Sequence, residues 1–258
     1  MSPRAEPCQF TNGRGMLFGV FHRPSEPHAG VLVLPPFLQE FPLSNRVLAI
    51  VADALASDGI AVLRLHYYGT GDSDGHSLEF SLEQATRDAA AALGALRERI
   101  GVMPVAVLGV RAGAFVASTL AARARLAALW LWRPLVDGAA YLADLHRIDA
   151  EEQASRHRYP EGRRPHPPLP HESLVGYACG TELVSELAVA RLDRDSDRWP
   201  PLVLLDRATH PRLPAPCQRI ELAAALTAWE GKLEMGHVPA GAARGVGNTL
   251  AGCLRGSA

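Results

Sequence analysis

The hydrophobic pattern of the chain alternates between two kinds of segment. Short continuous apolar runs, which are typical of buried strands, are separated by longer segments with apolar residues at helical spacing. The predicted strands are 16–22, 29–34, 60–65, 105–108, 126–132, 201–206 and a last short one at 219–222, while 223–229 fits a helix equally well. This alternation favours right-handed crossovers and a parallel sheet.

Four helices are expected between or after these strands. Ser44 can cap a helix that runs to Ser57, and Ser81 can cap one that runs to Ile100. An Ala-rich helix follows Gly113, and the last helix covers about 240–254.

The segment 137–198 breaks this rhythm. Amphipathic helical pieces flank a stretch rich in Pro, His and Arg at 159–171. An insertion at this point would cover the carboxyl edge of the sheet, where ligands bind in open α/β folds. We therefore predict a core formed by 1–136 and 199–258 with a lid at 137–198, while a plain surface loop remains the alternative.

A sharp turn between the strand at 105–108 and the Ala-rich helix is the most informative motif. It reads Gly109-Val110-Arg111-Ala112-Gly113. Strand, Gly-x-X-x-Gly and helix together form the frame of a nucleophile elbow, in which glycines keep Cβ atoms out of a strained turn. The predicted fold class is α/β, an α/β-hydrolase fold with a mostly parallel sheet, helices on both faces and a helical lid. Because the central residue is Arg111, the usual hydrolysis is expected to be lost or replaced.

Several stretches resemble one branch of this superfamily, the exosortase A system-associated hydrolase 2 family. They are Leu34-Pro35-Pro36-Phe37 with Glu40 and Ser44, Gly69-Thr70-Gly71-Asp72-Ser73 with Gly75, Leu108 to Ala114, and Trp132-Arg133-Pro134-Leu135 with Gly138. The similarity covers about 30–195, and that family also tends to carry Arg at the elbow. The resemblance implies association with an exosortase system, in a biosynthetic or export pathway, but fold does not establish function.

The order of a hydrolase triad along the chain is nucleophile, acid and base. Arg111 holds the first position, and a guanidinium offers no lone pair for acyl transfer. The acid position falls on His210, with Asp206 as an alternative nearer the strand end, and the base position is filled by His237. Ser73 is a weak substitute nucleophile, because Ser in such a turn usually bonds its own backbone.

Arg111 would lie at a helix N-terminus where backbone N–H groups converge. Donors are expected from Ala112 and from the Phe37–Leu38 turn, so that an anion could bind there. A cation at this end of a helix is disfavoured and needs a counter-charge, for which Glu40 is the first candidate and Asp206 the second. Arg111 therefore either grips the anionic head of a substrate or forms a buried ion pair that plugs the old site.

Three functions remain open. The first is a repurposed enzyme for a small anionic or acyl substrate, in which Arg111 binds and His237 or Glu40 moves protons, with Asp206 and His210 near the substrate. The second is a non-catalytic pseudo-hydrolase that acts as a binding or scaffold protein. The third is an esterase-like hydrolase with a non-standard nucleophile.

Composition narrows the partners. A formal net charge of −1 gives no overall basic field for nucleic acid, and the longest apolar runs are too short for a membrane span. The four cysteines lack CxxC spacing, and the irregular spacing of His157, His166 and His171 favours solvated loop, so neither a metal nor another cofactor is predicted. The absence of an apolar N-terminal core and the scattered cysteines favour a cytoplasmic protein, with a homodimer or a pathway partner as possible assemblies.

Overall fold

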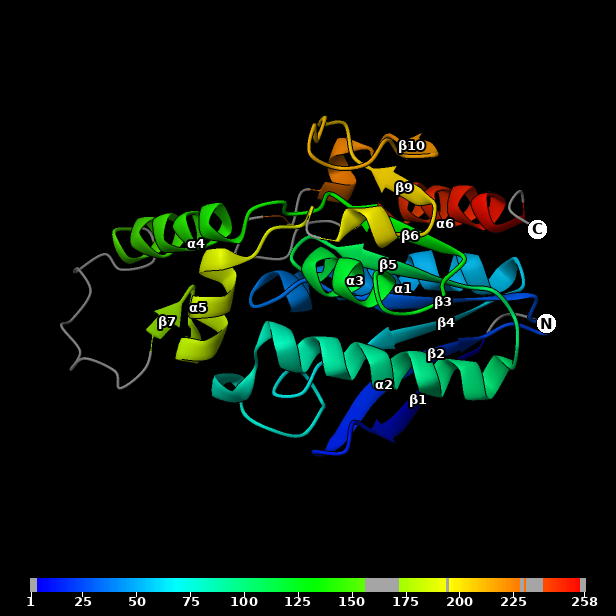
Figure 1. Cartoon of the computed structure of the whole chain (residues 1–258), viewed down its shortest axis with the longest axis horizontal. Helices are drawn as coiled ribbons and strands as arrows, with labels where there is room; N and C mark the ends of the chain where they lie inside the picture. The colour runs from blue at the N-terminus through cyan, green and yellow to red at the C-terminus, as the bar shows by residue number, and fades with distance from the viewer. Residues whose placement is uncertain (1–3, 156–171, 194, 228–229, 231–238, 256–258) are drawn as a thin grey trace.

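The architecture is a single twisted sheet between two layers of helices. The computed structural model describes residues 4–155, 172–193, 195–227, 230 and 239–255. Within these ranges the main sheet has eight strands in the order β1-β2-β4-β3-β5-β6-β9-β10, of which β1 and β2 are antiparallel to their neighbours and the rest parallel (Figure 1). The strands are β1 (Arg4–Thr11), β2 (Met16–Arg23), β3 (Ala29–Leu34), β4 (Ile60–Leu65), β5 (Val105–Val110), β6 (Ala128–Trp132), β9 (Leu202–Leu205) and β10 (Gln218–Ile220).

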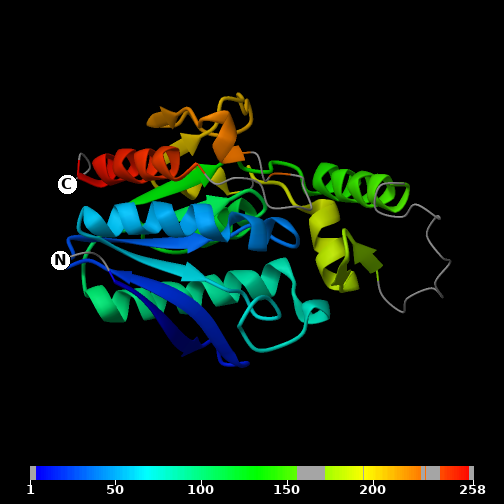
Figure 2. The same ribbon diagram turned by 180° about the vertical axis from the view of Figure 1, so that it is seen from behind.

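Helices cover both faces of the sheet. One face packs against α2 (Leu82–Ile100) and α3 (Gly113–Ala121), and the other against α1 (Glu40–Ser57) and α6 (Ala240–Arg255), which Figure 2 shows in front of the sheet. Successive residues of β3 alternate between the two cores: Leu32 belongs to the α2–α3 side and Val31 and Val33 to the α1–α6 side. Burial on both faces is the reason that the central strands are continuous apolar runs. The predicted α/β-hydrolase fold is confirmed.

The N-terminal edge differs from the prediction. The sequence pattern did not predict β1, which forms the edge by pairing with the expected strand at 16–22 as a hairpin around Asn12 and Gly13. Asn12 Oδ1 accepts hydrogen bonds from the backbone N–H groups of Arg14 and Gly15, and Gly13 has a φ of 85°, as a tight turn requires. The pattern missed β1 because it buries no residue fully and contains Pro7, which is tolerated on an edge strand.

Two helix caps were predicted from the sequence, and one of these predictions is wrong. α1 begins at Glu40, and the Ser44 hydroxyl donates to Phe41 O within the helix at 3.0 Å instead of capping it. The helix starts earlier because Pro42 fits a first helical turn, where its missing N–H leaves no bond unmade. Ser81 does cap α2, accepting from Gln84 N at 3.1 Å.

The segment between β6 and β9 lies beyond one end of the sheet, at the left of Figure 1. It contains α4 (Gly138–Gln153), a small hairpin of β7 (Glu172–Leu174) and β8 (Tyr177–Cys179), and α5 (Thr181–Val189). It contacts the core where a Cβ on Gly180 would come within 2.2 Å of Leu78 O, and where the Glu186 carboxylate accepts from the backbone N–H groups of Leu82 and Glu83. The hairpin was not expected from sequence. The whole Pro-rich stretch at 159–171 lies outside the described residues.

Three short 3-10 helices complete the described ranges: η1 (Ser77–Glu79), η2 (Ser196–Arg198) and η3 (Ala224–Thr227). The last of these bears out the helical alternative for part of 223–229. Over the described part of the chain, every helix is too short or too polar to span a bilayer.

Candidate functional site

Arg111 occupies the tight turn between β5 and α3. Its φ of 51° is in the left-handed region, which is strained for a residue with a side chain. A Cβ on Gly109 would approach Ala117 Cβ to 2.6 Å, and one on Gly113 would approach the carbonyl oxygens of Leu34 and Pro35 to 2.4 Å. These glycines therefore allow α3 to pack against β5 and against the end of β3, as the motif predicted.

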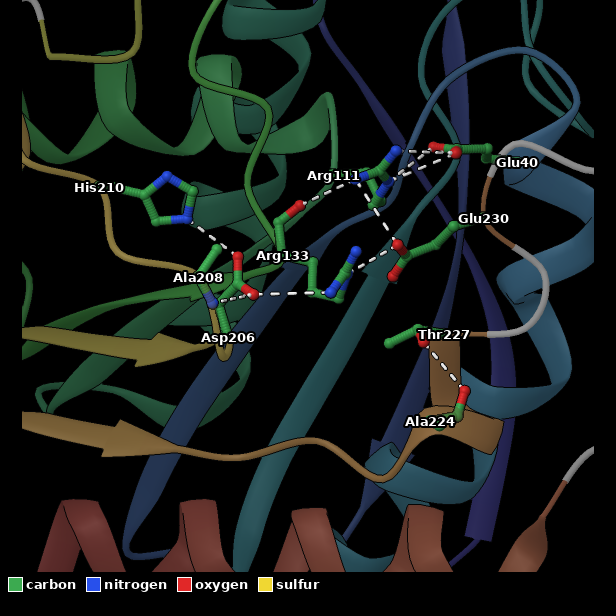
Figure 3. Close-up of polar contacts among 9 residues, drawn as sticks. All are labelled: Glu40, Arg111, Arg133, Asp206, Ala208, His210, Ala224, Thr227 and Glu230. Atoms are coloured by element: carbon green, nitrogen blue, oxygen red, sulfur yellow. Dashed lines mark hydrogen bonds and ion pairs between the residues drawn. The ribbon is translucent and has the colours of Figure 1, made fainter. Parts of the chain in front are cut away.

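The Arg111 side chain is held on three sides (Figure 3). Its Nε lies 3.3 Å from both carboxylate oxygens of Glu40, and its Nη2 is 3.3 Å from Oε1. Its Nη1 donates to Arg133 O at 3.3 Å and lies 3.7 Å from Glu230 Oε2. The side chain of Glu40 is 1% exposed and that of Arg111 is 16% exposed. The counter-charge expected at Glu40 is present, and this pair is buried.

The ion pairs continue away from the elbow. Arg133 Nε donates to Glu230 Oε2 at 2.7 Å, and Arg133 Nη1 lies 3.6 Å from Asp206 Oδ1. Asp206, which is 4% exposed, is in turn 2.9 Å from His210 Nε2. Asp206 and His210 thus lie next to each other, but Asp206 pairs with Arg133 and not with Arg111. We call the six residues Glu40, Arg111, Arg133, Asp206, His210 and Glu230 the elbow network.

Sequence reasoning missed Arg133 and Glu230. Arg133 directly follows β6, which is the parallel neighbour of β5, so the two strands end at the same edge of the sheet. That shared edge was an available signal. Glu230 stands between η3 and α6, outside any regular element, and no periodic pattern marks it.

Glu230 holds a proton more tightly than an ordinary glutamate. Burial raises the pKa of Glu230 to about 7, although Arg111 and Arg133 both act to lower it. Its Oε1 is buried and has no hydrogen-bond partner among the described residues. A carboxyl group with a pKa near neutrality, next to two arginines, is able to exchange a proton under physiological conditions.

Tyr141 brings α4 to the elbow network. Its side chain is 4% exposed, and its hydroxyl makes no hydrogen bond within the described part of the chain. Burial raises the pKa of Tyr141 well above its usual value, and Glu40 and Arg111 are close enough to act on it electrostatically in opposite directions. The segment between β6 and β9 thus places a buried aromatic side chain within electrostatic range of the Arg111–Glu40 pair.

The residues expected to supply backbone donors lie beside the elbow. Ala112 is fully buried at the start of α3. Phe37 and Leu38 line a pocket of about 170 Å³, together with Tyr67, Phe80 and Tyr177. Leu38 has a φ of 51°, in the same left-handed region as Arg111. Five of the twelve residues that line the pocket are aromatic, and none of the elbow network contributes to it.

The remaining candidate site residues either already have hydrogen-bond or ion-pair partners or lie outside the described residues. His237 lies outside the described residues, as do His157, His166 and His171. The Ser73 hydroxyl is already used, because it donates to His66 O at 2.7 Å and accepts from Phe18 N at 2.9 Å. Three carboxylates, of Glu83, Glu182 and Glu186, lie within 4.8 Å of one another, but Glu186 already caps α2 and Glu83 pairs with Arg87.

The sequence is similar to one known family. The model of the family described as serine aminopeptidase, S33, matches residues 43–161, which is less than half of the chain. This match includes the elbow but ends before β9. No curated protein is similar enough to match the sequence.

Solved structures with the same fold are distant in sequence. The esterase domain of a Rhodothermus marinus protein is 17% identical, with 98% of each chain covered and a TM-score of 0.63. Est1E from Butyrivibrio proteoclasticus, solved with ferulic acid bound, is 15% identical, with 96% of this chain and 99% of that chain covered and a TM-score of 0.61. XC6422 from Xanthomonas campestris, a serine hydrolase without a lid, is 22% identical, but this chain spans only 62% of its length and the TM-score is 0.46. The first two show that the chain has the α/β-hydrolase fold.

Proposed function

We propose that this α/β-hydrolase-fold chain is a non-catalytic pseudo-hydrolase, in which Arg111 stands in place of the nucleophile and the protein acts by binding. The observation that carries this proposal is the pairing of Arg111, whose three guanidinium nitrogens all make polar contacts with Glu40, Glu230 or Arg133 O. A guanidinium offers no nucleophile, and one that is already neutralised attracts a substrate anion weakly.

The biological setting in this proposal comes from the sequence. The scattered cysteines support a cytoplasmic setting. The resemblance to exosortase A system-associated hydrolase 2 supports a role beside a partner protein, in a biosynthetic or export pathway. We retain 137–198 as the lid, because α4 contributes Tyr141 to the neighbourhood of Glu40 and Arg111. In this proposal the lid closes over a site that no longer turns over a substrate.

Thermal unfolding in the presence of ligands tests the proposal. Small carboxylates, phosphates, sugar phosphates and acyl-CoAs are screened against the wild type and Arg111→Met. A ligand at about a hundred times its dissociation constant would add roughly 2.7 kcal/mol of stability, which is easily detected. We expect no stabilisation that depends on Arg111 and a strongly destabilised variant. Stabilisation by one anion class that vanishes in Arg111→Met would contradict the proposal.

A second candidate is a repurposed acid–base enzyme for a small anionic or acyl substrate. The pKa of about 7 at Glu230 favours it, because a general acid or base works best when its pKa is near the working pH. In this candidate Glu230 moves a proton with Glu40 or His237, while the Asp206–His210 pair positions the substrate. Turnover of any acyl or phosphoryl substrate that is lost in Glu230→Gln but kept in Glu151→Gln, an exposed control on α4, would decide in its favour.

The esterase alternative has a separate test. A fluorophosphonate probe labels an activated serine covalently, and we expect no labelling because the Ser73 hydroxyl is held by backbone groups on both sides. Labelling that disappears in Ser73→Ala would establish a serine hydrolase.

A further inference from the structure

Residues of α2 and α3 line a surface groove. Figure 1 shows these two helices on the face of the sheet opposite α1 and α6. It consists of two hollows, one of about 390 Å³ between the helices and one of about 660 Å³ where β5 and β6 begin. Arg97 lines both, so the two hollows lie next to each other. The groove lies outside the elbow network, and nothing in the proposed function uses it.

The floor of this groove is apolar, and at one point it lacks a side chain. Leu93, Leu120 and Leu126 contribute to it, and Val102, in the loop before β5, borders the second hollow with a completely exposed side chain. Gly94 is exposed in the middle of α2, where a glycine is about 1 kcal/mol less favourable than alanine. A Cβ at this position would meet no atom within 4 Å, so packing within the chain does not require the glycine. Its absence of a side chain leaves room for a partner to approach the helix.

The walls of the groove are cationic. Arg97, Arg123 and Arg125 are exposed along it, and no carboxylate of the described residues forms an ion pair with any of the three. Arg97 instead donates to Arg125 O at 2.5 Å, which places the Arg97 side chain beside the backbone of Arg125. At the far end Arg87 is neutralised by Glu83. Because the formal net charge of the whole chain is −1, this positive charge is a property of the groove and not of the protein surface as a whole.

We propose that this groove is a docking site for an acidic segment of a partner protein. Carboxylates of the segment would pair with Arg97, Arg123 and Arg125, while small apolar side chains rest on the floor beside Gly94. We choose an acidic ligand because its negative charges complement the three arginines. The concave shape favours a peptide over a membrane, because a flat bilayer would reach the rims of a groove but not its floor.

Fluorescence anisotropy with a defined probe tests this docking site. The probe is a short fluorescein-labelled peptide rich in Glu and Leu, and its counterpart with Gln in place of Glu is the neutral control. Both are titrated with the full chain at about 0.15 M salt, where long-range charge attraction is screened. We expect binding of the acidic peptide and at least tenfold weaker binding of the neutral one, roughly the sum of three exposed ion pairs.

Two sets of variants assign the binding to the groove. Arg97→Glu, Arg123→Glu and Arg125→Glu together are expected to weaken binding about tenfold or more, whereas the matched change of three exposed arginines outside the groove has little effect. Those controls are Arg46→Glu, Arg212→Glu and Arg244→Glu. Gly94→Trp should block the floor without changing charge, and Gly94→Ala should leave binding unchanged. Thermal unfolding of each variant verifies that it is folded.

Three results would overturn the proposal. The first is no binding of the acidic peptide, and the second is equal weakening by the groove and control arginine sets, which would mean non-specific charge attraction. The third is no effect of Gly94→Trp on peptide binding. Vesicles of phosphatidylglycerol and phosphatidylcholine are titrated in parallel, and binding of vesicles alone, lost with the groove arginines, would assign the surface to a membrane instead.

Discussion

Arg111 Nε lies 3.3 Å from both carboxylate oxygens of Glu40, whose side chain is 1% exposed. The pair stands at the tight turn of an α/β-hydrolase fold, where a nucleophile would need a free side chain. Glu230 and Arg133 O occupy the other side of the guanidinium. The elbow keeps its backbone geometry while its central side chain is used for an ion pair, and the free energy of that pair can be measured.

Removing one partner of the Arg111–Glu40 pair should lower the free energy of unfolding strongly, and removing both partners should lower it much less. Arg111→Met leaves the Glu40 carboxylate buried without its main counter-charge, which we expect to lower the free energy of unfolding by about 3–5 kcal/mol. Adding Glu40→Leu should recover a large part of this loss, because no uncompensated charge remains. Urea unfolding of the two single variants and the double variant gives the coupling energy.

The control for this cycle is the exposed pair of Arg147 and Glu151 on α4, at 2.8 Å. Its removal should change stability by less than about 1 kcal/mol, as for other surface pairs. Strict additivity of Arg111→Met and Glu40→Leu would contradict the structural role of the buried pair.

Glu230 should make stability fall as pH rises. Its pKa is about 7 in the folded protein and 4.5 without the influence of the fold, so between these values the folded state binds more protons than the unfolded state. The free energy of unfolding then decreases with increasing pH across that window, by at most on the order of 3 kcal/mol. Glu230→Gln should remove this slope, as measured by urea unfolding at several pH values. An unchanged slope in the variant, with Glu151→Gln as the exposed control, would mean that Glu230 is ionised throughout.

Much of the fold could be predicted because a strand that is buried on both faces of the sheet is a continuous apolar run in the sequence. β4 lies at the residues expected for it, and β5 extends the expected strand by two residues. β1 and the β7–β8 hairpin escaped detection because an edge strand with half-buried residues and strands of three residues leave too few apolar positions to count. Ser44 misled the prediction because a serine near a helix start is compatible with a cap and with an in-helix bond to the preceding turn.

The candidate site was predictable where it depends on local sequence. The elbow is a continuous motif, and the need of Arg111 for a counter-charge indicated Glu40 before any coordinates. Glu230 lies between η3 and α6, outside any helix or strand, and no periodic pattern indicates its position. The same holds for the electrostatic effect of Glu40 and Arg111 on Tyr141, since the position of Tyr141 follows from the packing of α4.

Two buried histidines should make the protein sensitive to acid. His22 donates from Nδ1 to Asp53 at 2.7 Å and accepts at Nε2 from Arg64 at 3.0 Å, and burial together with Arg64 lowers its pKa. Burial also lowers the pKa of His66. Below pH 6.5 the unfolded chain therefore binds more protons at these histidines than the folded chain does. The free energy of unfolding falls as pH falls for this reason.

This acid effect has the opposite sign to that of Glu230 in an overlapping window. It is best measured in the Glu230→Gln background, where we expect the free energy of unfolding to drop between pH 7 and pH 5.5, on the order of 1 kcal/mol or more. Adding His22→Gln should shrink that drop, because an amide can keep a donor and an acceptor but does not titrate. An equal drop with and without His22 would assign the acid sensitivity to other groups.

Two glycine-to-alanine substitutions should have opposite effects because of what surrounds each Cβ. At Gly113 the added atom would meet the carbonyl oxygens of Leu34 and Pro35 at 2.4 Å, and backbone atoms of a buried strand end cannot move aside cheaply. We expect Gly113→Ala to destabilise by about 2–3 kcal/mol. At Gly94 nothing lies within 4 Å, so Gly94→Ala should stabilise by about 1 kcal/mol through helix propensity alone. Urea unfolding of both variants at one pH measures the difference, and a harmless Gly113→Ala would mean that α3 does not approach the end of β3 as closely as the elbow geometry requires.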